Sequence, residues 1–429
     1  MTDPATAPTA TRTAAAELAR SQLLSAFIGG GLFFMLVPGT FLGVLNLVQI
    51  SSRESVALVS QAWLQAHGHA QVFGWVGSFI LGIGFYSIPT PGGGSKPALA
   101  CGWASWGMWS AGVAMRWAAG VSAWQWRLLL PVSSLLELTA FLVFLGVVFR
   151  HRPAGSTARR FEPWVRTVIS ATVGLSLVLV ANTAASVYVS WRGDTPALPH
   201  ALDQRFLVLV TWGFLAPFVW GFTARWMPVF LGLQATRHRL LAVALVATGL
   251  GVLLSVLGWG AWATGLFVFG AALAAAALRL FEPTRHPPKT RGVHPSFPFF
   301  VRAAYGWLLI AAVLGVAAAV WDTSGGIWGA SRHAFTVGFV AVMIFSVGQR
   351  VLPAFVGAHR LWSPELMFAG LILLTTGCAL RVTSEVLAYQ DYASWAWSVL
   401  PVSAVIELTA VTLFAANLVG TFFLQERTA

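Results

Sequence analysis

Charged residues are scarce in this sequence. Asp, Glu, Lys and Arg make up 9% of the 429 residues, whereas apolar residues make up 57% and the mean hydropathy is +0.75. Ordinary soluble domains contain about 25% charged residues. This composition therefore excludes a water-soluble fold, and we expect the lipid bilayer to surround most of the chain.

Cysteine is nearly absent as well. Cys101 and Cys378 both fall in apolar stretches, and no Cys-x-x-Cys-His sequence occurs. The chain therefore lacks a disulfide framework and cannot attach a c-type haem covalently, so any haem has to be non-covalent, either haem b or a modified relative of it. The glycine-rich stretch 91–96 is not followed by the Gly-Lys-Ser/Thr of a phosphate-binding loop, which indicates a turn.

Long apolar runs are what the sequence has in abundance. A membrane-spanning helix needs about 20 apolar residues. We predict an all-α polytopic membrane protein of twelve transmembrane helices, with a cytoplasmic tail at 1–22 and a single membrane domain at 23–429. The twelve runs lie at approximately 23–48, 69–88, 98–119, 127–149, 165–190, 204–226, 239–258, 260–281, 299–321, 333–352, 364–386 and 396–424.

The net charge of +12 has to be assigned to the two sides of the membrane. Successive loops between the twelve runs lie on opposite sides of the membrane, and both termini then lie on the same side. Most of the 26 Lys and Arg residues fall on that side. Positive charge accumulates on the cytoplasmic side. We therefore expect cytoplasmic N- and C-termini, and the basic pI needs no nucleic-acid partner.

An internal repeat organises the chain. Residues 131–141 (PVSSLLELTAF) and 401–411 (PVSAVIELTAV) share seven of eleven positions, and a similar offset relates Gly112 to Gly377 and His69 to His333. A weaker middle copy has valine at position 208 in place of the two histidines. The pattern predicts three four-helix units, about 23–150, 165–281 and 299–424, in a pseudo-threefold ring around an axis along the membrane normal.

Histidines stand out because ionisable residues at membrane depth are costly and usually functional. His69 and His333 are expected at the outer ends of equivalent helices. Two imidazoles can hold haem iron in a six-coordinate centre, so these two are candidate ligands of one haem. The alternative is that they are interfacial histidines that hydrogen-bond to loop carbonyls or lipid head groups. His67, about 200° from His69 around the helix, binds a metal such as copper or holds a loop, and His200 is expected in a loop.

Other ionisable residues flank these histidines. Arg116 and Arg381 are candidates for pairing with haem propionates, although both could also reach the lipid head groups. Glu137 and Glu407 lie near mid-membrane in the repeated segments, where they relay protons or accept hydrogen bonds from neighbouring helices.

Several short motifs resemble the NnrS family of membrane proteins. They are His67–Trp75 (HGHAQVFGW), Arg225-x-x-Pro228-x-Phe230, Arg332–Gly338 (RHAFTVG), Gln349-Arg350 and 357–360 (GAHR). The resemblance implies twelve helices, haem and copper, a place in the bacterial inner (cytoplasmic) membrane and a link to nitric oxide. The arrangement is also similar to subunit I of haem-copper oxidases, in which histidines on helices 2 and 10 hold a haem. The oxidase copper ligands on helices 6 and 7 have no counterpart inside those spans.

Three functions follow from these features. The first is a haem-binding membrane protein that acts in nitric-oxide or redox stress, or in electron transfer. The second is a quinol-linked or nitric-oxide reductase, and the third is a repeat-built transporter without haem. The prolines noted at helix ends, Pro89, Pro228 and Pro353, disfavour transport, because transporters commonly break helices at mid-membrane.

Overall fold

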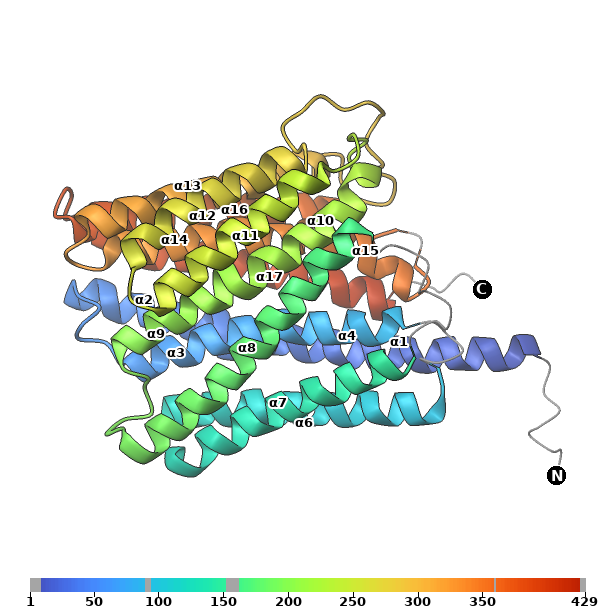
Figure 1. The fold of residues 1–429 in the computed structure, drawn as a ribbon, viewed down its shortest axis with the longest axis horizontal. Helices are drawn as coiled ribbons and strands as arrows, with labels where there is room; N and C mark the ends of the chain where they lie inside the picture. The colour runs from blue at the N-terminus through green and yellow to red at the C-terminus, as the bar shows by residue number, and fades with distance from the viewer. Residues whose placement is uncertain (1–8, 89–93, 152–161, 359, 425–429) are drawn as a thin grey trace. The chain divides into compact units, whose positions relative to one another are not determined.

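The computed structural model describes residues 9–88, 94–151, 162–358 and 360–424, and every regular element in these ranges is helical (Figure 1). Eleven helical stretches there are long and apolar enough to cross a membrane, which confirms the helical membrane class. The remaining predicted span is helix α6 (Lys96–Ser122), whose tryptophan-rich sequence lowers its hydropathy. Pro89 and His359 lie outside the described residues.

The described helices form two compact units. Unit 1 comprises Met1–Leu42, Ser60–Ala158 and Asn182–Leu198. Its elements are α1 (Thr9–Phe34), η2 (Met35–Phe41), α3 (Gln61–His69), η3 (Ala70–Gly77), α4 (Ser78–Ser87), α6, α7 (Trp126–Arg150) and the end of α8 (Pro163–Arg192). Helix α1 begins within the predicted tail because residues 9–22 are rich in alanine and other good helix formers.

Unit 2 comprises Gly43–Val59, Arg159–Ala181 and Pro199–Ala429. Its elements are most of α2 (Leu42–Arg53), the start of α8, α9 (His200–Val208), η5 (Leu209–Leu215), α10 (Ala216–Phe230), α11 (His238–Val256), α12 (Gly260–Ala277), α13 (Phe297–Trp321), α14 (Gly326–His333), η6 (Ala334–Ala341), α15 (Val342–Phe355), α16 (Pro364–Tyr389), α17 (Ala396–Val419) and η7 (Gly420–Leu424).

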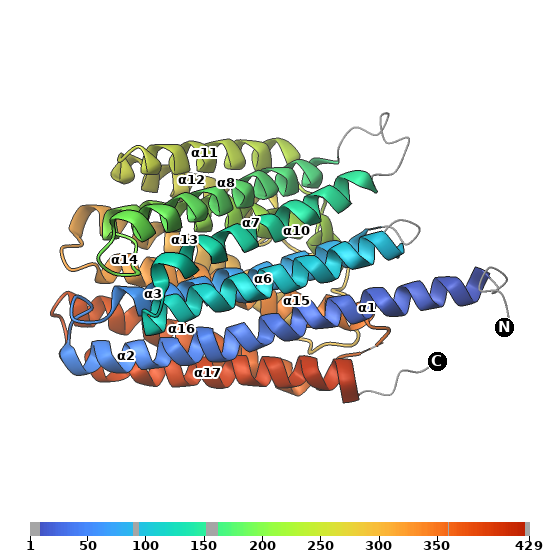
Figure 2. The ribbon, with the colours of Figure 1, turned by 90° about the horizontal axis from the view of Figure 1, so that it is seen from below.

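Consecutive helices pair within each unit. In unit 1, α6 packs along α7, and in unit 2, α11 packs along α12 and α16 along α17 (Figure 2). Serine side chains begin two of these helices: Ser95 accepts a hydrogen bond from the Ala98 amide, and Ser363 accepts one from the Leu366 amide. Each serine satisfies an amide that the first helical turn would otherwise leave unpaired.

Wide π-helical turns interrupt several of the long helices. Segment η3 follows His69 directly, η6 follows His333 directly, and η5 follows Val208 directly. Such turns are rare in proteins and are frequently found at functional sites. A widened turn therefore adjoins both predicted haem-binding histidines and the valine aligned with them.

Candidate functional site: two histidine–glutamate pairs

The first pair lies inside unit 1. His69 is the last residue of α3, and its Nε2 atom is 2.7 Å from Oε1 of Glu137 on α7. Asn182 donates a hydrogen bond to the other carboxylate oxygen at 3.2 Å. Glu137 is 0% exposed. The ring of Phe73 stacks on the imidazole of His69, with ring centroids 4.3 Å apart. Both carboxylate oxygens thus have a partner, as a buried charge requires.

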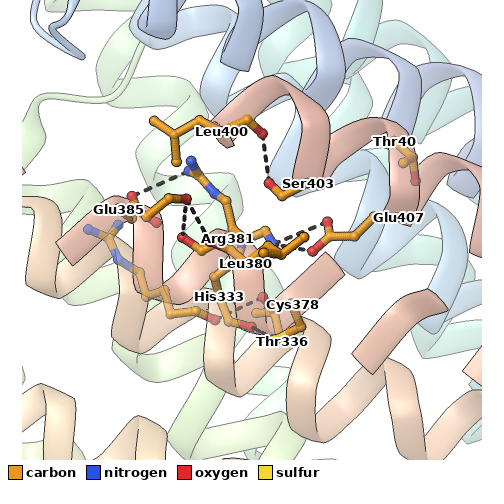
Figure 3. A network of polar contacts seen from close by, with 12 residues as sticks. Thr40, His333, Thr336, Cys378, Leu380, Arg381, Glu385, Leu400, Ser403 and Glu407 are labelled. Atoms are coloured by element: carbon orange, nitrogen blue, oxygen red, sulfur yellow. Dashed lines mark hydrogen bonds and ion pairs between the residues drawn. The ribbon is translucent and has the colours of Figure 1, made fainter. Parts of the chain in front are cut away.

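The second pair lies inside unit 2 and joins α14 to α17 (Figure 3). Nε2 of His333 is 3.0 Å from Oε1 and 3.2 Å from Oε2 of Glu407. The side chain of His333 keeps 21% of its surface exposed, against 5% for His69. Cys378 donates a weak hydrogen bond to the backbone carbonyl of His333 at 3.9 Å. The second pair is therefore more accessible than the first.

A glycine lets a neighbouring helix approach each glutamate closely. A Cβ atom added to Gly112 on α6 would lie 2.8 Å from Cγ of Glu137 and 2.8 Å from the Ser133 carbonyl oxygen. A Cβ atom on Gly377 of α16 would lie 2.7 Å from Cγ of Glu407. Glycine at these two positions thus brings the helix backbone against the glutamate side chain.

A third helix pair has the same type of contact without the ionisable residues. A Cβ atom on Gly251 of α11 would lie 2.7 Å from the ring of Phe267 on α12. Phe267 stacks on Trp212 of η5, with ring centroids 4.6 Å apart and an interplanar angle of 5°. An aromatic pair thus lies beside this glycine, where the other two helix pairs have a glutamate bound to a histidine.

The structure places the histidines further along their helices than predicted. Helix α3 begins at Gln61 and α14 at Gly326, so His69 and His333 lie roughly two turns inside, about 10–12 Å from the first residue. The expectation that these histidines open their helices is therefore wrong. The predicted runs 69–88 and 333–352 left out residues 61–68 and 326–332, which belong to the same helices.

The other histidines have different positions. Nδ1 of His67 is 2.8 Å from the backbone carbonyl oxygen of Gly39 in η2, whereas His69 faces α7. The two histidines therefore contact different elements, and the backbone that His67 contacts belongs to a helical segment and not to the expected loop. His200, predicted in a loop, is the exposed first residue of α9.

Comparison with known proteins gives one family match. Residues 230–421 match the family model DUF8744, described as a domain of unknown function. No curated protein matches the chain. The match covers less than half of the chain, so the chain is similar to DUF8744 over this segment. The matched segment contains His333 and Glu407, and it excludes His69 and Glu137.

The DUF8744-like segment also contains Arg381. Its Nη2 atom is 3.3 Å from Oε1 of Glu385, one helical turn further along α16 (Figure 3). Among the described residues, no partner reaches Nε or Nη1 of Arg381, or Oε2 of Glu385, although all three atoms are buried. Arg116, its predicted counterpart on α6, is half-buried. Sequence reasoning did not single out Glu385 as the ion-pair partner of Arg381.

Neither unit contains a cluster of metal-binding side chains in its described residues. No group of three or more His, Cys, Asp or Glu side chains is arranged to hold a metal ion there. The copper that the NnrS resemblance implies therefore has no identified ligand set in the described part of the chain.

Proposed function

We propose that this chain is a haem-binding integral membrane protein with His69 and His333 as iron ligands. The observation that carries the proposal is the histidine–glutamate pair found in both units, each beside a π-helical segment and a close-packed glycine. An imidazole that binds a metal usually donates its second N–H to a carboxylate or carbonyl, which fixes the ring and raises its basicity. Glu137 and Glu407 suit that role.

The ring nitrogens fit this assignment. Nε2 of each histidine is engaged by its glutamate, and no hydrogen bond between described residues occupies Nδ1 of His69 or His333. Neutral imidazole binds metals through either nitrogen, so Nδ1 is the atom for iron. A haem held by both histidines would supply one-electron transfer, and nitric oxide would bind to it by displacing one of the two imidazoles.

Arg381 offers a second point of contact for haem. Buried and unpaired charged donors are unfavourable, and a guanidinium pairs with a carboxylate through two parallel hydrogen bonds. The Nε and Nη1 atoms of Arg381 lack partners among the described residues and lie on different edges of the guanidinium, so a haem propionate would satisfy one of them. A buried guanidinium with donors that lack an acceptor among the described residues suits a ligand that carries carboxylates, as haem does, and this supports the proposal.

The finer architecture belongs to the same proposal. Three four-helix repeats account for the similar environments of Gly112, Gly251 and Gly377, and the middle repeat has replaced its ionisable pair by aromatic rings. The distribution of Lys and Arg supports cytoplasmic termini. The resemblance to NnrS supports a role in nitric-oxide or redox stress in the bacterial inner membrane.

The test is the optical spectrum of the full-length protein purified in detergent from haem-replete cells. We expect b-type bands in the dithionite-reduced protein, and their loss in His69→Ala and in His333→Ala. His200→Ala removes an exposed histidine from a helix start and should keep the wild-type spectrum. Adding nitric oxide to the reduced protein should then shift the bands. A colourless wild-type protein, or unchanged bands in both ligand variants, would refute the proposal.

A repeat-built transporter is the second candidate, because one of the interrupted helical stretches has a proline within its π-helical segment. Pro38 lies in η2, inside the 40-residue stretch Ala14–Arg53. Side chains already bond to the carbonyls of this turn: Trp117 donates to Pro38 at 3.1 Å, and His67 contacts Gly39. The backbone is therefore satisfied by protein groups, which leaves these carbonyls less suited to coordinating a transported ion.

A further inference from the structure

One end of unit 2 gathers three segments that are far apart in the sequence, described at residues 231–237, 278–296, and 356–358 with 360–363. Backbone hydrogen bonds hold them to neighbouring helix ends and to one another. Arg237 donates to Ala277 at 2.8 Å, Lys289 donates to Phe230 at 2.8 Å, and Leu361 donates to Gly292 at 3.0 Å. The side chains of these segments therefore share one surface, which we call the basic face.

The basic face is strongly positive. Acidic residues in these segments and the adjoining first helical turns are limited to Glu282 and Glu365, both among the described residues. Glu282 is shared between Arg237 at 2.8 Å and Arg279 at 3.1 Å, and Glu365 accepts a hydrogen bond from Ser363. Most of the positive charge is thus left uncompensated. The exposed basic residues of these segments are Arg237, Arg285, Lys289, Arg291 and Arg360, and Arg239 follows in the first turn of α11.

Aromatic rings border the basic face where it meets the helices. The Arg225 guanidinium lies 5.5 Å from the ring centre of Trp164 and 5.2 Å from that of Trp226. Arg350 lies over Phe230 at 5.1 Å. Tryptophan rings collect at the level of the lipid head groups. The rings therefore place the charges of the basic face at the depth of lipid phosphates.

We propose that the basic face binds anionic phospholipid head groups, of which phosphatidylglycerol is the probe. Arginine and lysine donate to phosphate oxygens, and clustered basic residues beside membrane helices attract anionic lipids. The adjoining tryptophan rings favour a lipid over an acidic soluble protein, because a lipid can contact ring and guanidinium together. This inference is independent of haem.

The experiment titrates short-chain phosphatidylglycerol into the detergent-solubilised full-length protein and counts retained lipids by native mass spectrometry. Removing one basic residue weakens such binding about fivefold, so Arg285→Ser with Arg291→Ser should weaken it roughly 25-fold. The matched control replaces Arg53 and Arg205, two exposed arginines at the opposite helix ends of unit 2, and should retain the wild-type affinity.

Phosphatidylcholine provides the comparison of lipids, since it has the same phosphate but no net charge. The wild type should retain phosphatidylglycerol in preference, and 0.5 M salt should remove most of that preference through screening, at about a 4 Å Debye length. This second measurement needs no variant. Equal retention of the two lipids by the wild type would overturn the proposal. Wild-type affinity of the double variant for phosphatidylglycerol would also overturn it, and would point to an acidic protein as the partner of the basic face.

Discussion

Replacing Gly112 by alanine tests how closely α6 packs against the first histidine–glutamate pair. The added methyl group would lie 2.8 Å from Cγ of Glu137 and 2.8 Å from the Ser133 carbonyl oxygen. The carbonyl belongs to the backbone of α7, so it cannot turn away as a side chain could. Either the two helices separate or the Glu137 side chain leaves the position in which it binds His69.

The size of the effect follows from this geometry. Overpacking by one methyl group in a close-packed interior costs about 1–3 kcal/mol. In water, replacing a helical glycine would recover up to about 1 kcal/mol of helix propensity. Membrane helices stay formed when they separate, so this recovery should be small here. We therefore expect Gly112→Ala to lower the free energy of helix dissociation by about 1–3 kcal/mol.

The assay is unfolding in mixed micelles with increasing dodecyl sulfate, followed by tryptophan fluorescence. Gly107 on the same helix is the matched control, because a Cβ atom there would meet no atom within 4 Å. Gly107→Ala should change stability by less than about 0.5 kcal/mol. Equal unfolding of the two variants would show that α6 and α7 do not pack closely at Gly112.

Two further predictions concern the glutamates and a helix start. Glu137→Leu leaves two buried donors without an acceptor and should lower the free energy of unfolding by about 2–4 kcal/mol. Glu407→Leu should lower it by about half as much, because water can reach His333. Equal losses in the same unfolding assay would contradict the difference in burial. Asp322→Ala removes the side-chain oxygen that accepts a hydrogen bond from the Trp328 amide at 2.8 Å. The free energy of opening the first turn of α14, measured by hydrogen exchange, should fall by about 0.5–2 kcal/mol. Unchanged exchange there would mean that Asp322 does not cap the helix.

The candidate residues were recognisable before the fold, but their partners were not. His69, His333, Glu137 and Glu407 stand out because so few ionisable residues occur in apolar runs. Their pairing was missed because the histidines were expected at helix ends and the glutamates at mid-membrane. The predicted runs began at the histidines themselves and so left out the first turns of α3 and α14.

The sequence by itself determined the solvent, the helical class and the approximate spans, because these depend on the average hydropathy of about 20 consecutive residues. It also singled out the glycines, histidines and glutamates as a recurring set. Only the tertiary structure decided which of them touch. Each successive helical residue turns the side-chain direction by about 100°, and hydrogen bonds form only within about 3 Å. The helix starts, the π-helical turns and the close glycine contacts therefore decide that His69 meets Glu137 and that His333 meets Glu407.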